Sequence, residues 1–242
     1  MPIQILALCP ITELTSAFLV IVVLPIMLID ISPTLQNDMP GWPGDTPFGC
    51  RRVAEIGPAC PVNVSSFTTS VHIGAHADAP NHFTRDGLDI ASLAPDIFIG
   101  ACVLIDARSA KGPLITADDV LQQLPIAVER VLIRQYDAYP KIWDAALKGL
   151  QPELIGELAR RGCRLIGVDA ASVDPADSKS LDAHHACDRN GICIIEGLLL
   201  DGVPPGEYEL IALPMKLAGS DAAPVRAILR TTVNSPKQGA RP

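Results

Sequence analysis

The sequence predicts an α/β domain built on a mixed β-sheet, and three observations point to it. The chain has 242 residues and is 48% hydrophobic, so it can bury one substantial core, and its length requires no second domain. Segments typical of strands outnumber those typical of helices. The two kinds are interspersed along the chain without an internal repeat, which indicates an α/β or α+β domain with a mixed sheet, and we take α/β.

Eight segments are expected to form strands, because each is a short run rich in apolar or β-branched residues. The run at residues 163–168 delivers Asp169 to a loop, and the run at residues 99–105 ends at Asp106. The expected strands are residues 27–31, 62–71, 99–105, 130–135, 163–168, 192–195, 208–213 and 225–233.

Three segments carry helix signals. The first begins at Thr116, a residue type that favours the N-cap, and two acids follow it. The second has Pro152 in its first turn and Gly162 at its end, and the third is closed by Gly191. Residues 33–48 are too dense in Pro and Gly for regular structure. The expected helices are residues 116–124, 152–161 and 181–190.

The N-terminal region holds an apolar run, residues 17–29, that resembles a membrane or export segment. It is too short to span a bilayer, which needs about 20 apolar residues. No Lys or Arg precedes it, and no small-residue cleavage site follows it. We expect the folded domain to cover residues 27–242, residues 1–26 to be an extension outside the fold, and no membrane partner. An export segment is the alternative.

Charge and cysteine content narrow the class of partner and the compartment. The net charge of -8 and the pI near 5.0 argue against nucleic acid, which needs a basic surface, and favour a small-molecule substrate. The seven cysteines are odd in number and contain no C-x-x-C pair, so neither a disulfide framework nor a thiolate zinc site is indicated. We therefore expect a cytoplasmic protein.

The histidines are the main functional signal, because all five lie in two places. His72 and His76 are four apart, so in a helical turn they would share one face, and Asp78 follows. Two imidazoles and a carboxylate suit a divalent ion. His82 comes shortly after, and as a fourth group that need not bind metal it could move protons.

The second histidine cluster strengthens the metal interpretation, since a single H-x-x-x-H pair recurs by chance. His184 and His185 precede Glu196, which again joins imidazole to an acid. On a helix the two histidines point about 100° apart, so only one should face the site. Weaker candidates are treated as structural: Asp169 and Asp174 as turn or cap residues, Trp143 as packing, and Cys187 and Cys193 as small buried hydrophobes.

Three motifs carry a resemblance to a known family. WPGDTPF at Trp42–Phe48, HIGAHADAPNH at His72–His82, and LDAHH with EGL in residues 181–198 resemble the bacterial kynurenine formamidases of the metal-dependent cyclase family. The similarity runs from about Leu28 to the segment near Val233. The broader family has Thr at the position of Ala75. The formamidase branch has Ala there, so the difference does not weaken the resemblance. The resemblance implies a swivelling β/β/α fold and a homodimer.

The resemblance also implies a site with two zinc ions per subunit, or manganese in their place. His82 would be the proton donor and acceptor, and Trp42 would contact the substrate. One ion would be bound by His72, His76 and Asp78, and the other by Asp78, His184 and Glu196, with Asp78 as the bridge.

The expected reaction is hydrolysis of N-formyl-L-kynurenine to L-kynurenine and formate, an arylformamidase step of tryptophan degradation. A metal lowers the pKa of its bound water from 15.7 toward about 7, which supplies a hydroxide for attack on the formyl carbon, with His82 as proton shuttle. One alternative is an amide hydrolase of the same family that opens a cyclic amide such as isatin. A non-catalytic metal-binding module is a second, and a cysteine hydrolase, for which no nucleophile motif is found, is a third.

Overall fold

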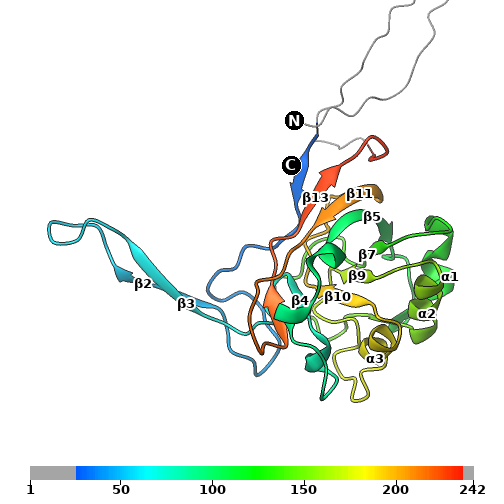
Figure 1. Cartoon of the computed structure of the whole chain (residues 1–242), viewed down its shortest axis with the longest axis horizontal. Coiled ribbons are helices and arrows are strands. Elements are labelled where there is room, and N and C mark those ends of the chain that lie inside the picture. The colour runs from blue at the N-terminus through cyan, green and yellow to red at the C-terminus, as the bar shows by residue number, and fades with distance from the viewer. Residues whose placement is uncertain (1–25, 237–242) are drawn as a thin grey trace, which may run out of the picture.

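The computed structural model describes residues 26–236, which form an α/β fold around one mixed nine-stranded sheet, as predicted (Figure 1). Its central strands are parallel to one another, and the outer strands on both sides pair antiparallel. In spatial order the strands are β1 (Leu28–Asp30), β13 (Ile228–Thr231), β11 (Gly206–Ile211), β5 (Ile99–Asp106), β7 (Arg130–Arg134), β9 (Leu165–Val168), β10 (Cys193–Glu196), β4 (His76–Asp78) and β12 (Ala222–Pro224).

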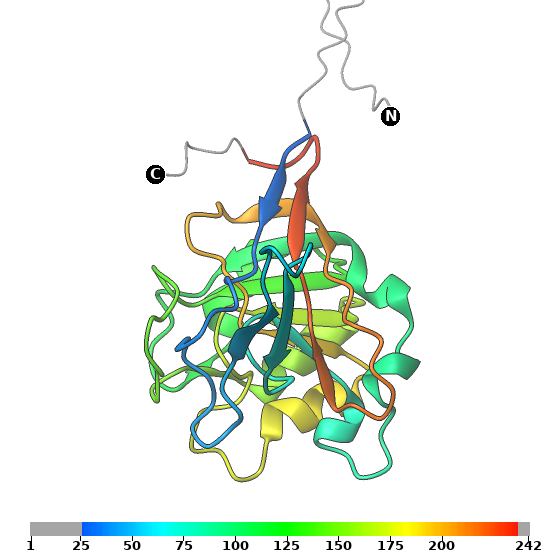
Figure 2. The same cartoon turned by 90° about the vertical axis from the view of Figure 1, so that its left-hand side faces the viewer.

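The sheet is strongly curled. In Figure 2 the blue and red strands β1 and β13 run steeply across the direction of the green and yellow central strands. One buried cluster contains Ile29 of β1, Leu132 of β7 and Ala223 of β12, so residues from both ends of the sheet pack on the same core. The sheet therefore folds around its own concave face, much as a half-barrel does.

Three helices cover the other face of the central strands (Figure 1). The side chains of Val131 and Ile133 on β7 pack there with Leu154 and Leu158 of the second helix. Because both faces of β7 are covered, all five of its residues are buried, as expected for a central parallel strand. The helices are α1 (Ala117–Val120), α2 (Pro152–Arg160) and α3 (Asp182–Arg189).

The first helix is shorter than the sequence predicts. Thr116 and Asp119 form the capping box that starts α1, with the Asp119 carboxylate accepting from the backbone N–H of Thr116 at 2.8 Å. The chain then tightens into a 3₁₀ turn, Leu121–Gln123, and Pro125 follows. Leu124, the residue before that proline, is extended, because proline disfavours the helical conformation there.

The interpretation of His72 and His76 as a helical pair is wrong. His76 is the first residue of β4, a strand too short and too polar to predict from an apolar pattern, and His72 lies in the bends that precede it. On β4, His76 and Asp78 are two apart and point to the same face. The strand pairs with β10, which sets His76 opposite Glu196, and with β12, which sets Asp78 opposite Ala222.

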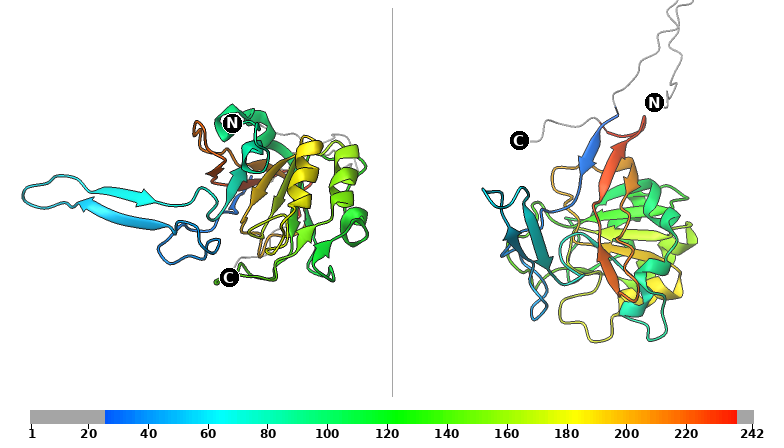
Figure 3. Two further views of the ribbon diagram at one scale, coloured as in Figure 1. Left: turned by 90° about the horizontal axis from the view of Figure 1, so that it is seen from below. Right: turned by 60° about the vertical axis from the view of Figure 1, so that its left-hand side comes forward.

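A two-stranded hairpin extends away from the body of the molecule (Figures 1 and 3). It consists of β2 (Gly49–Ala54), which the sequence did not predict, and β3 (Val64–Thr68), which ends before the expected limit of residue 71. A second small sheet joins β6 (Leu114–Ile115) to β8 (Gly149–Leu150).

The extension predicted at residues 1–26 falls almost entirely outside the described residues. Within residues 26–236, no helix is long and apolar enough to cross a membrane.

A close backbone approach joins the end of β10 to the loop before β4. Gly197 has a φ of +66°, and a Cβ built on it would lie 2.2 Å from the carbonyl oxygen of Gly74. We expect Gly197→Ala to lower the free energy of unfolding by about 2–4 kcal/mol, from left-handed strain plus overpacking. Gly191→Ala, at φ +64° with no atom within 4 Å, should cost only the strain of about 1–2 kcal/mol. Urea titration of both variants tests this, and equal costs would contradict it.

Candidate metal centre

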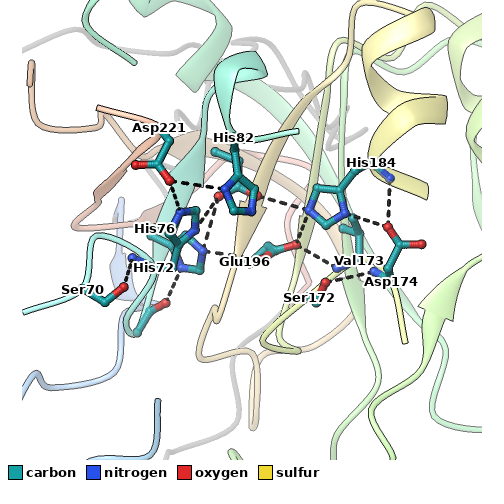
Figure 4. Close-up of polar contacts among 12 residues, drawn as sticks. Ser70, His72, His76, His82, Ser172, Val173, Asp174, His184, Glu196 and Asp221 are labelled. Atoms are coloured by element: carbon teal, nitrogen blue, oxygen red, sulfur yellow. Dashed lines mark hydrogen bonds and ion pairs between the residues drawn. The ribbon is translucent and has the colours of Figure 1, made fainter. Parts of the chain in front are cut away.

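Six of the predicted site residues meet at one place in the structure, and all of them except Asp78 are labelled in Figure 4. His76 and Asp78 come from β4 and Glu196 from the end of the adjacent β10. His184 comes from α3, and His82 from the 3₁₀ turn Pro80–His82. Four of these residues, His76, Asp78, His184 and Glu196, are each no more than 3% exposed.

Asp78 lies at the centre of the cluster, and its two oxygens face different histidines. Asp78 Oδ1 is 3.1 Å from His72 Nδ1 and 3.5 Å from His76 Nε2. Asp78 Oδ2 is 3.4 Å from His184 Nε2. One carboxylate thus contacts the imidazoles of both histidine clusters, which are more than a hundred residues apart in the chain.

Glu196 faces two of the same imidazoles from the other side. Its Oε2 is 3.5 Å from His76 Nε2, and its Oε1 is 3.5 Å from His184 Nε2. The backbone N–H of Val173 donates to Glu196 Oε1 at 2.8 Å, which fixes the carboxylate. Two nitrogens therefore each lie between two carboxylates in a buried space.

The hydrogen bonds around the cluster leave the inward-facing atoms free. His76 Nδ1–H donates to the carbonyl oxygen of Gly74 at 2.9 Å, and His184 Nδ1 lies 2.6 Å from Asp174 Oδ2. Both rings thus have their Nε2 pointing inward. Among the described residues, the buried atoms without a hydrogen-bond partner include His76 Nε2, His184 Nε2 and both oxygens of Asp78.

Such orphaned atoms are rare in folded proteins, because burying a polar group without a partner costs about 1–3 kcal/mol, and more for a charged group. Imidazole nitrogens and carboxylate oxygens are ligands of Zn²⁺ and related divalent cations. Two sets of three ligand atoms each lie within 4.8 Å of one another: His72, Asp78 and His82 in one, and His76, Asp78 and Glu196 in the other. The donor set therefore fits a divalent cation, and Asp78 belongs to both sets.

The charges of the cluster also favour a cation. Burial disfavours a charged imidazole, but the hydrogen bond of His184 with Asp174 and the nearby carboxylates of Asp78 and Glu196 outweigh it and raise the pKa of His184 to about 10. In the same way Asp78 and Asp221 outweigh desolvation and raise the pKa of His72 to about 9. The carboxylates thus keep the imidazoles protonated, and a divalent cation that binds the imidazole nitrogens would displace those protons, so metal uptake should release protons.

Two acids that sequence reasoning did not assign to the site contact it. Asp174, read as a turn or cap residue, accepts from the backbone N–H groups of Ala183 and His184 at the start of α3 and also contacts the His184 ring. Asp221, which carries no motif, lies 3.0 Å from His72 Nε2 and 3.3 Å from His82 Nδ1 (Figure 4). Only the fold could reveal Asp221, which is far from both histidines in sequence.

The two neighbouring histidines of α3 diverge as predicted. His184 is buried in the cluster, whereas His185 is partly exposed and packs edge-on against Phe83, with ring centroids 6.3 Å apart. His82 differs from the buried histidines because its side chain is 32% exposed. It can therefore reach both the cluster and any molecule in front of it.

A cavity of about 680 Å³ opens onto the cluster. Its wall is aromatic: Trp42 and Trp143 meet edge to face with ring centroids 4.8 Å apart, and Tyr136 and Tyr139 lie on the same wall. Trp143, expected only to pack, thus lines the cavity beside Trp42. No Lys or Arg is among the described residues that line it. The cavity can take an aromatic molecule whose reactive group reaches the histidines.

The chain is similar to several known proteins. The Cyclase family model, described as putative cyclase, matches residues 29–175. The chain is 53% identical over 202 residues to the kynurenine formamidase of Maricaulis maris (strain MCS10), covering 83% of this chain and 96% of that relative. It is 49% identical over 212 residues to the kynurenine formamidase of Paracidovorax citrulli (strain AAC00-1), covering 86% and 98%. A solved structure described as a potential metal-dependent hydrolase with cyclase activity is 27% identical, with a TM-score of 0.74, covering 85% of this chain and 98% of that one.

The contact between Asp174 and His184 predicts a metal-binding effect. Asp174→Asn should weaken metal affinity by about 10–100-fold, because the amide no longer holds the His184 ring as the carboxylate does. The amide oxygen of Asn can still accept from one of the backbone N–H groups at the start of α3. Competition with a chromogenic chelator measures the affinity. Asp177→Asn, in the exposed part of the same loop, is the matched control and should bind as the wild type does. Unchanged affinity in the Asp174 variant would contradict the prediction.

Proposed function

Because this chain belongs to the cyclase family, within its kynurenine formamidase group, we propose that it hydrolyses N-formyl-L-kynurenine to L-kynurenine and formate. The single observation that carries the proposal is the set of orphaned imidazole and carboxylate atoms at the end of an aromatic-walled cavity. An arylformamide needs both parts, since the ring must be held while its amide is brought to the reacting groups. The reaction belongs to tryptophan degradation.

We assign zinc as the metal, with two ions per subunit and Asp78 as the bridge, and manganese as the alternative ion. The bridge is supported by the presence of Asp78 in both sets of ligand atoms, and by its two oxygens facing different histidines. The sets group His72 with His82 and His76 with Glu196, whereas the assignment follows the family and groups His72 with His76 and His184 with Glu196. The ligands would be His72, His76, Asp78, His184 and Glu196. Such ions supply Lewis acidity and lower the pKa of water toward about 7.

His82 is assigned as the proton shuttle rather than as a ligand. It is the most exposed histidine of the cluster, and its Nδ1 is engaged by Asp221, which leaves Nε2 for a proton. That nitrogen would take a proton from the attacking water and give it to the departing aniline nitrogen, so that an amine and not an amide anion leaves. Trp42, with Trp143 against it, would contact the aromatic ring of the substrate.

We further place the protein in the cytoplasm as a homodimer, with residues 27–242 as one catalytic domain of the swivelling β/β/α type. The six described cysteines are free, which suits a reducing compartment. The β2–β3 hairpin supports a dimer, because it projects from the body and exposes apolar side chains (Figure 3). Its exposed apolar residues are Val53, Ile56, Val62, Val64 and Phe67.

The reaction is tested with purified protein, N-formyl-L-kynurenine, and a chelator. Turnover should disappear on chelation and return when zinc or manganese is added back. His82→Ala should keep the full metal content and lower kcat by about 10²–10⁴-fold. His185→Ala, whose ring packs against Phe83, is the matched control and should keep the wild-type rate. A wild-type protein that binds metal and opens isatin but leaves the formamide intact would overturn the substrate assignment.

If the β2–β3 hairpin forms the dimer interface, charged substitutions on it should break the dimer. Phe67→Asp and Val64→Asp should convert the dimer to monomers, because each puts a charge where apolar side chains would pack between subunits. Ile126→Asp replaces an apolar residue that is 93% exposed on another part of the surface, and should leave the dimer intact. Sedimentation velocity distinguishes the species. A dimer that survives both hairpin substitutions would refute the role of the hairpin.

A further inference from the structure

Asp221 occupies a fixed position between a histidine of the metal cluster and the histidine assigned to proton transfer. Its Oδ2 lies 3.0 Å from His72 Nε2 and 3.3 Å from His82 Nδ1, and the two rings face each other with centroids 4.1 Å apart (Figure 4). Within the described residues, Asp221 is the hydrogen-bond partner of the His82 ring. Because a carboxylate oxygen only accepts, the ring nitrogen that faces it must carry the proton.

The backbone holds Asp221 firmly against the turn that carries His82. The carbonyl oxygen of Asp221 accepts from the N–H of Ala79 at 2.9 Å, directly before that turn. The next residue, Ala222, pairs with Asp78 in the β12–β4 ladder, and the carbonyl oxygen of Ser220 accepts from Ile90. Asp221 directly precedes β12, His82 lies in the turn after β4, and these two strands pair. The paired backbone therefore sets the distance between the two residues, which does not depend on long flexible side chains.

We propose that Asp221 is the positioning residue of the proton shuttle: its carboxylate accepts from His82 Nδ1–H and so keeps His82 Nε2 as the nitrogen that exchanges a proton with the substrate. By the same oxygen it accepts from His72 Nε2–H, which leaves His72 Nδ1 directed at Asp78. One side chain therefore sets the ring orientation of a metal-site histidine and of the shuttle together. This inference rests on the proposed function for the identity of the substrate and for the role of His82 as the proton shuttle.

The proton inventory of the reaction requires this arrangement. Water adds its oxygen to the formyl carbon, and one of its protons passes to His82 Nε2. The C–N bond then breaks, its electron pair stays on the aniline nitrogen, and that nitrogen takes the proton from Nε2, giving the free amine and formic acid. The second proton of the water leaves when formic acid ionises to formate in solvent. The Nδ1 proton stays on the ring throughout. A ring with its proton on Nε2 at the start could not accept one from water there, so the tautomer decides whether the step occurs.

The tautomer can be measured without any substrate. In ¹⁵N–¹H spectra of metal-loaded protein, comparison with His82→Ala identifies the His82 signals. We expect the Nδ1–H form in the wild type and a mixture, or the Nε2–H form, in Asp221→Asn, because the amide can donate as well as accept. An Nε2–H ring in the wild type, or an unchanged ring in the variant, would overturn the proposal, and neither result depends on which amide is hydrolysed.

Kinetics with N-formyl-L-kynurenine then separate positioning from a general structural role. Because Asp221 also contacts His72, a proposed metal ligand, the variant is assayed at saturating metal. Under that condition Asp221→Asn should lower kcat by about 10–100-fold with KM little changed, and it should add little further loss in a His82→Ala background. Equal losses in both backgrounds at full metal occupancy would show that Asp221 does not act through His82. A wild-type enzyme that is inactive on this substrate but shows the expected tautomer would refute the proposed function alone.

Asp89→Asn is the matched control. The Asp89 carboxylate accepts from the N–H of Gly219, so it holds the same loop but does not touch either histidine. This variant should keep the wild-type tautomer of His82 and the wild-type kcat. If it instead reproduces the Asp221→Asn spectrum, the loop position and not the Asp221 carboxylate sets the ring, and the proposal fails.

Discussion

The structure depends on burying several acids and imidazoles together without giving their inner atoms a partner. Both oxygens of Asp78 and the Nε2 atoms of His76 and His184 lack a hydrogen bond, although each is fully enclosed. A cation that enters the cluster would stabilise this arrangement, because the two oxygens of Asp78 have lost water and gained no hydrogen-bond donor. The fold can be understood as a frame that keeps these atoms converging on one point.

That frame is built from backbone more than from side chains. β4 is held on both edges, by β10 and by β12, so its two site residues cannot move independently of the sheet. Gly197 and Gly74 approach closely enough to exclude a side chain, which sets the carbonyl oxygen that orients His76. Asp174 and the Val173 N–H fix His184 and Glu196 in the same way. Preorganised ligands of this kind bind a cation without a further ordering cost.

The sequence predicted the parts of the molecule whose signal is local. Apolar runs such as residues 130–135 predicted the central strands, and the start and stop signals Pro152 and Gly162 predicted α2. β4 was missed because strands are predicted from apolar residues that pack in the core, whereas two of its three buried residues, His76 and Asp78, are polar and belong to the site. Asp221 was missed because it is 139 residues from His82, and only strand pairing brings the two together. The six clustered site residues came from local motifs and a family resemblance, which do not fix distances.

Anomalous diffraction tests most directly whether the orphaned atoms converge on metal ions. Crystals of zinc-loaded protein, measured on either side of the zinc absorption edge, should show two peaks per chain, each within about 2.0–2.3 Å of imidazole nitrogens or carboxylate oxygens of the cluster, with Asp78 near both. Absence of any peak between Asp78, His76, His184 and Glu196, or peaks bound only by other residues, would contradict the account.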